Sequence, residues 1–169
     1  MTQLERLARP FPARYVKAPA QGKFGAYVPH DVVTQALLAI CGPYDLEVGQ
    51  VFMGPDGQIE GCLVTLCLTI DDRRVCITEV GDCEQPGNWK TQGARMKDAI
   101  SDGVKRCAMR FGLGLHLWAQ DDYFLYDQLH RREEEVSGLR PLPEEGESAP
   151  TARKANGAGE PELDPARPF

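Results

Sequence analysis

The chain has 169 residues, 42% of them hydrophobic, which suits one domain over residues 1–140 followed by a tail over residues 141–169. Its sequence has no apolar run of about 18 residues and no apolar core of a secretory signal near the start, which argues against a membrane span and against secretion. We therefore expect a soluble cytoplasmic protein.

The net charge of −6 hides a segregation of charge along the chain. Residues 1–30 carry a net +4, residues 31–89 carry −8, and residues 90–110 carry +4 again. Two basic segments therefore flank an acidic middle. A polyanion would bind where the basic segments meet, provided that they meet in space; the alternative is that these charges are merely solvated.

A helix is predicted over residues 31–42, where Asp31 can cap the start and Gly42 can end the last turn. Its apolar residues recur at helical spacing: Val32, Val33, Ala36, Leu37 and Ile40.

Three strands are predicted next, over residues 46–53, 61–70 and 75–80. The turn sequences GPDGQ and DDRR separate them, so an antiparallel meander is expected. The middle strand alternates, with one apolar face made by Cys62, Val64, Leu66, Leu68 and Ile70.

A long helix is predicted over residues 91–111, ended by Gly112. One arc forms a core stripe of Met96, Ile100, Val104, Cys107 and Phe111. Arg95, Arg106 and Arg110 fall on the far side, with Lys105 beside them, and Asp102 can pair with Arg106. Gly103 inside a helix implies close approach of a sheet backbone or of DNA. A final helix is expected to close at the glutamates of residues 133–135. The fold class is α+β: a helix, a three-stranded antiparallel meander and a long helix packed on the sheet.

The sequence lacks the usual patterns of catalysis. The six cysteines show no zinc spacing and are expected to be reduced, buried thiols. No phosphate-binding loop occurs, and no histidine pattern indicates a metal. We therefore predict no enzymatic activity, no cofactor and no metal. A metal-dependent nuclease using Asp71 and Asp72, or Asp121 and Asp122, is an alternative.

Four segments together resemble the Rad fifty-two family of single-strand annealing proteins, including its phage recombinases and the DNA damage response A proteins of radiation-tolerant bacteria. They cover about residues 11–120. In chain order they are YVKAPAQGKFGAYVPHDVV, LLAICGPYDLEV, GCLVTLCLTIDDRRVCITEVGDCE and DAISDGVKRCAMRFG. The last is the most specific, and the ending GLGLHLW looks more like the bacterial branch. The resemblance implies the annealing-domain fold, and it implies binding and annealing of single-stranded DNA without ATP, in recombination and repair, by an oligomeric ring.

Carried over by motif, Lys105 and Arg106 would line the DNA groove, joined by Arg14, Lys17 and Lys23 from the first basic segment. The second basic segment adds Lys90, Arg95, Lys97 and Arg110. Three aromatic residues could stack bases, although packing of the N-terminal segment is the favoured role: Tyr15, Phe24 and Tyr27. The main alternative function is a module that protects single-stranded ends without annealing them, and a structural adaptor without DNA affinity is a further one.

The tail of residues 141–169 is acidic and rich in proline and glycine, so we predict disorder. Its end, Pro168 and Phe169, resembles the tip of bacterial single-strand binding proteins, which docks partner proteins. A single-strand binding protein or an exonuclease is an expected partner of the protein. Self-association is expected as well, because the middle strand is apolar on both faces.

Overall fold

A computed structural model describes residues 1–19, 25–83, 86–119 and 122–137. The chain divides into two units, Met1–Gly138 and Leu139–Phe169. The second unit lies outside the described residues, as do the predicted disorder of the tail and the roles given to Pro168 and Phe169. The first unit contains α1 (Gln3–Ala8), α2 (His30–Cys41), β1 (Asp45–Met53), β2 (Ile59–Ile70), β3 (Arg73–Asp82), α3 (Gln92–Arg110) and α4 (Leu125–Ser137), with short 3-10 turns η1 (Ala13–Tyr15), η2 (Pro86–Asn88) and η3 (Leu115–Leu117).

The three strands form an antiparallel sheet in the order β1-β2-β3, which confirms the predicted meander. A turn with Gly57 at φ +71° joins β1 to β2, and the tight turn after β2 holds Asp71 and Asp72 at φ 48° and 62°. Aspartate tolerates this left-handed region better than most residues, so the DDRR turn has a local cause.

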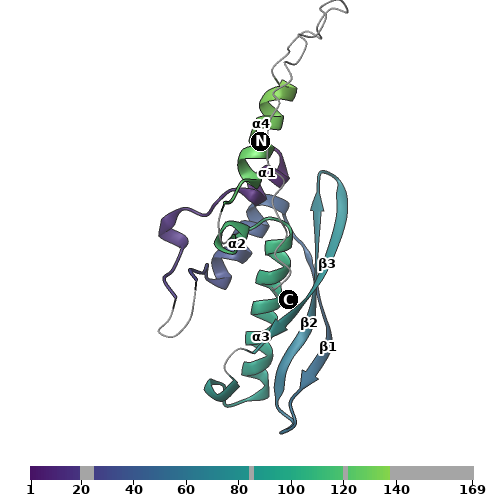
Figure 1. Cartoon of the computed structure of the whole chain (residues 1–169). Coiled ribbons are helices and arrows are strands. Elements are labelled where there is room, and N and C mark those ends of the chain that lie inside the picture. Colours follow the sequence, from purple (N-terminus) through teal and green to yellow (C-terminus); the bar gives the residue numbers. More distant parts are fainter. Residues whose placement is uncertain (20–24, 84–85, 120–121, 138–169) are drawn as a thin grey trace, which may run out of the picture. The chain divides into compact units, whose positions relative to one another are not determined.

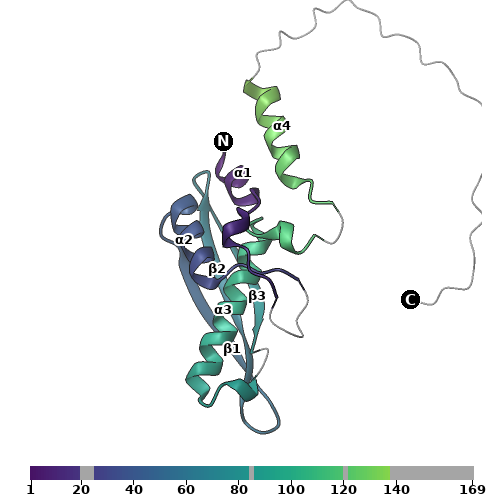
Figure 2. The same ribbon diagram turned by 90° about the vertical axis from the view of Figure 1, so that its left-hand side faces the viewer.

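The core lies between one face of the sheet and the helices. Cys62, Val64, Leu66 and Leu68 of β2 are fully buried, as their alternation predicted. Helix α3 packs along β2 and β3, while α2 adds Val33 and Leu37 at one end of the same core (Figures 1 and 2). The coarse prediction of an α+β fold with helices packed on an antiparallel meander is therefore confirmed.

Helix α2 starts one residue earlier than predicted. Pro29 occupies the N-cap position without a side-chain hydrogen bond, and Asp31 lies in the first turn, so the capping role predicted for Asp31 is wrong. A carboxylate in that turn still interacts favourably with the helix dipole. Gly42 ends the helix as predicted, at φ +77° and with its N–H donated to the carbonyl of Leu38.

Helix α3 is fixed at both ends. The Thr91 side chain accepts a hydrogen bond from the Ala94 N–H, and Gln92 ties the first turn to the β1–β2 turn by bonding the Ile59 N–H and the Gly57 carbonyl. Gly112, at φ +101°, follows the last turn as predicted.

The buried face of α3 is wider than the predicted stripe. Arg95 is only 9% exposed, and Ala99, Asp102 and Gly103 are buried with it. The prediction that Arg95 lies on a solvent face is therefore wrong. The reason is that small residues at 99 and 103 let this side of the helix approach β3 closely, a relationship that helical spacing alone does not reveal.

Helix α1 was not predicted, although its start carries the capping-box signature. Thr2 accepts from the Glu5 N–H, and the Glu5 carboxylate accepts from the Thr2 N–H. Glu5 is fully buried and pairs with His130 of α4 at 2.7 Å, and the Tyr123 hydroxyl donates to the Ala8 carbonyl. These contacts hold α4 against α1.

Cys67 and Cys76, directly opposite each other on β2 and β3, form a disulfide. The expectation that all six cysteines are free thiols is therefore wrong for this pair, since cross-strand register brings together two cysteines that the sequence separates by nine positions. Cys41, Cys62, Cys83 and Cys107 are free thiols. Within the described ranges, no helix has the length and apolar character needed to cross a bilayer.

Candidate nucleic-acid interface

A cavity of about 420 Å³ opens beside α3, between the N-terminal segment, the loop around η2 and the turn η3. Helix α3 contributes Asp98, Asp102 and Lys105, and β3 contributes Asp82. Most of the other walls are apolar or aromatic: Phe11, Tyr27, Val28, Val33, Trp89, Leu113, Leu117 and Trp118. Residues of the first basic segment and of the second therefore line one concave surface, and Lys105 is the one cation among its described lining residues.

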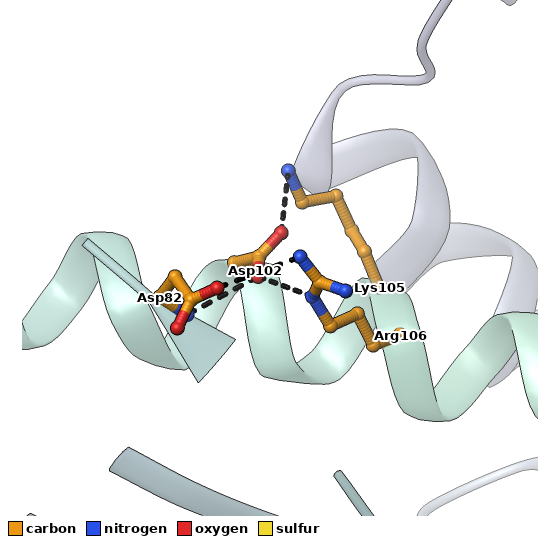
Figure 3. A network of polar contacts seen from close by, with 4 residues as sticks. All are labelled: Asp82, Asp102, Lys105 and Arg106. Atoms are coloured by element: carbon orange, nitrogen blue, oxygen red, sulfur yellow. Dashed lines mark hydrogen bonds and ion pairs between the residues drawn. The ribbon is translucent and has the colours of Figure 1, made fainter. Parts of the chain in front are cut away.

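Asp102 organises the polar wall of this cavity (Figure 3). Its Oδ2 accepts from Arg106 Nε at 2.6 Å and from the Asp82 backbone N–H at 3.2 Å, while its Oδ1 lies 4.0 Å from Lys105 Nζ. Arg106 Nη2 also lies 3.7 Å from the Asp82 carboxylate. The predicted Asp102–Arg106 pair is confirmed, and the cluster contains two cations and two carboxylates.

Asp102 and Asp82 hold the Arg106 side chain in place, but they do not engage all of its N–H donors. The hydrogen bond that Arg106 donates to Asp102 raises the pKa of the guanidinium above its ordinary value, so the charge is permanent. The guanidinium also lies 5.9 Å from the centre of the Trp118 ring, within cation–π range. Because Arg106 has five N–H donors and is one-third exposed, it can still donate to a phosphate.

Two other arginines of α3 have partners inside the fold. Arg110 Nε donates to Glu79 of β3 at 2.5 Å, which ties the helix to the sheet edge. Arg95 Nε donates to the Trp89 carbonyl at 3.0 Å. The structure therefore shows Arg95 holding the loop that carries Trp89, and its contact with DNA stays a prediction.

Four exposed cations that make no ion pair with a carboxylate of the described residues lie on the N-terminal segment, the loop before α3 and α3 itself: Arg14, Lys17, Lys90 and Lys97. Lys17 pairs through its backbone with Tyr27, and Lys90 follows Trp89 directly. Lys97 is exposed on α3, and Arg14 lies over the ring of Tyr15 at 4.8 Å. Lys23 lies outside the described residues.

Aromatic side chains contribute more to this surface than the sequence indicated. Tyr15 and Tyr27 are exposed, so packing of the N-terminal segment, the favoured prediction, does not bury them; Phe24 is outside the described residues. Trp89 and Trp118 were not predicted as site residues. A usable signal existed, because a tryptophan follows the basic helix at 118 and another precedes it at 89, and exposed tryptophan is uncommon outside binding surfaces.

Among the described residues, no three side chains of histidine, cysteine, aspartate or glutamate gather in a group that could hold a metal ion. Asp71 and Asp72 occupy a turn between strands, and Asp121 is outside the described residues. The cavity offers flat aromatic surface, carboxylate oxygens that accept hydrogen bonds, and Lys105 in its wall.

Comparison with protein-family models and with curated proteins finds no match for this chain. The resemblance to the Rad fifty-two family therefore stays a prediction, carried by the four quoted segments. The function below is argued from the geometry of the cavity and its cations together with that resemblance.

Proposed function

We propose that this protein binds single-stranded DNA at the cavity beside α3 and anneals complementary strands without ATP, as an oligomeric annealing protein of the Rad fifty-two type acting in recombination and repair. The observation that carries the proposal is that residues of both basic segments line one aromatic cavity, with Lys105 in its wall and Arg106 bonded to Asp102 of the same wall. A single strand presents a line of phosphates and unpaired base faces, and proteins hold it with cations and stacking aromatic side chains.

The cations supply the sequence-independent part of this binding. Lys105 and Arg106 lie on a helix fixed at both ends, so they present charge at a defined position. Lys17, paired through its backbone with Tyr27, and Lys90, next to Trp89, adjoin lining residues of the cavity, and Lys97 is exposed on the same helix. Lysine and arginine gain affinity by releasing counterions condensed on the phosphates. Contacts of this kind leave base edges available for pairing, which annealing requires.

The acidic surface elsewhere fits the same function. The exposed face of β1 carries Asp45 and Glu47, and the three strands together hold five of the ten acidic residues between residues 31 and 89. Such a surface repels DNA, so the strand would be confined to the cavity and its rim. Within the proposed function we place the protein in the cytoplasm of a bacterial or phage-infected cell, where it would need no cofactor.

The test of the proposal is pairing of two complementary labelled oligonucleotides in the absence of nucleotide and metal. Acceleration that declines with added salt is the expected result.

A further inference from the structure

The chain has two tryptophans, Trp89 and Trp118, and both line the cavity beside α3. They reach it from different elements: Trp89 from the loop before α3, held by Arg95, and Trp118 from the end of η3, beneath Arg106. Tyr27 and Phe11 complete an aromatic lining. A volume of about 420 Å³ lies within the range of pockets that enclose small organic groups.

The polar part of the lining is acidic. Asp82, Asp98 and Asp102 face the cavity against one cation, Lys105. Three carboxylates repel a phosphate, so the phosphate line of a strand would stay at the rim, beside Arg106, Lys17 and Lys90. The interior of the cavity therefore suits a neutral, flat group with polar atoms at its edge.

Asp98 differs from the other two carboxylates. The Asp102 carboxylate already interacts with Arg106, with Lys105 and with the Asp82 N–H, and the Asp82 carboxylate lies near Arg106. Asp98 makes no hydrogen bond or ion pair with any residue of the described ranges, although it is half-buried in the cavity wall. It is therefore an open acceptor, and a carboxylate prefers an N–H donor such as an exocyclic amino group.

We propose that the cavity takes one unstacked nucleobase bearing an exocyclic amino group, which stacks on Trp89 or Trp118 and donates to Asp98. Cytosine, adenine and guanine carry such a group, and thymine does not. This inference rests on the proposed function, since it deepens the same site from strand binding to base selection. Under this inference, the protein binds the phosphate backbone of the strand at the rim of the cavity and binds single bases inside the cavity.

Intrinsic fluorescence tests the inference directly, because all tryptophan emission comes from the cavity. The full chain is titrated with end-labelled oligodeoxycytidine, with oligodeoxythymidine and with an abasic oligonucleotide of equal length. Label anisotropy reports strand binding and tryptophan emission reports entry of a base. We expect quenching with oligodeoxycytidine and none with the abasic strand, and Trp89→Phe and Trp118→Phe assign the quenching to a ring.

Asp98→Ala tests the acceptor, with Asp45→Ala on β1 as the matched loss of an exposed carboxylate. We expect wild-type protein to bind oligodeoxycytidine about fivefold to tenfold more tightly than oligodeoxythymidine, and Asp98→Ala to abolish that preference while Asp45→Ala retains it. Binding of oligodeoxycytidine without quenching would overturn the inference and leave the proposed function standing. Equal affinity of the wild-type protein for the two oligonucleotides would overturn the role of Asp98. Absence of binding to every oligonucleotide would overturn both the inference and the proposed function.

Discussion

Gly103 of α3 packs directly against Gly81 of β3. A Cβ atom added to Gly81 would lie 2.6 Å from the Gly103 nitrogen, and one added to Gly103 would clash with the side chain of Val64. The close approach of the β3 backbone therefore explains why residue 103 is a glycine. The alternative explanation, that Gly103 makes room for DNA, is not needed. This contact brings Asp102 within reach of the Asp82 N–H and so places the polar wall of the cavity.

Gly103→Ala should destabilise the fold. Overpacking costs about 1 to 3 kcal/mol, which exceeds the gain of up to about 1 kcal/mol from better helix propensity. Gly93→Ala in the first turn of the same helix is the matched control, since nothing lies within 4 Å of an added Cβ there. Urea unfolding should show a lower midpoint for the first variant and an unchanged or higher midpoint for the second. The reverse order would contradict the packing described here.

Lys105→Ala combined with Arg106→Ala should lower affinity for single-stranded DNA at least about tenfold. Losing two phosphate contacts should also reduce the log–log dependence of affinity on salt by about 1.4, from an expected slope of about −3 to −4 for four to six contacts. Anisotropy titrations at several salt concentrations measure both quantities.

The matched control for that pair is Arg74→Ala, which removes a cation from an ion pair with Asp45 on the sheet and away from the lining of the cavity. Its affinity for DNA should equal that of the wild type. Because removal of Arg106 leaves Asp102 with fewer partners, circular dichroism must show that the double variant is folded. A folded double variant with wild-type affinity and salt slope would remove Lys105 and Arg106 from the interface.

Acidification should lower the free energy of unfolding through protonation of His116. Burial lowers the pKa of this imidazole below its ordinary value, and neither ring nitrogen has a hydrogen-bond partner among the described residues. The unfolded chain then binds a proton that the folded chain excludes. This contribution to stability is complete above about pH 6.5 and is lost as the pH falls through the interval between the unfolded and folded pKa values.

His116→Phe should reduce the loss of unfolding free energy between about pH 7.5 and pH 5.5, because an apolar ring suits the contact with Phe11 and Tyr123 and has no charged form. His30→Phe at the exposed start of α2 is the control. If the pH dependence of urea unfolding were the same for wild type and His116→Phe, the buried imidazole would have no such effect.

Loss of the Cys67–Cys76 disulfide should lower stability by about 2 to 3 kcal/mol, the loop-closure value for about ten residues. Cys67→Ser measured against oxidised wild type gives this difference. Titration of thiols in the unfolded, unreduced chain should find four, matching Cys41, Cys62, Cys83 and Cys107. Six titratable thiols would contradict the pairing.

Local signals in the sequence predict much of this fold. The alternation of β2, the turns GPDGQ and DDRR, the end of α2 at Gly42 and the Asp102–Arg106 pair all depend on residues close in the chain, and the structure bears them out. Signals that depend on register between distant elements were missed. The disulfide, the Arg110–Glu79 pair and the burial of Arg95 each need the packing of two elements to be known.

The candidate site was likewise predictable only in part, because some of its features depend on the packing of distant elements. The resemblance implies that Lys105, Arg106 and cations of the first basic segment share one surface, and Lys105 lines a cavity to which the first basic segment also contributes residues. The sequence does not reveal that Asp82 and Asp102 neutralise part of that charge, since Asp82 comes from β3. Nor does it reveal that Trp89 and Trp118 face the same cavity from opposite ends of α3, because an aromatic residue beside a helix more often packs in a core.

The measurement that tests the central claim most directly is annealing of two complementary fluorescent oligonucleotides, without ATP or divalent metal, at low and high salt. The proposed function predicts pairing faster than the spontaneous rate, an advantage that shrinks as salt rises, and loss of acceleration in the folded Lys105→Ala, Arg106→Ala variant but not in Arg74→Ala. No acceleration with binding intact would contradict annealing and leave a protein that binds or protects single-stranded ends.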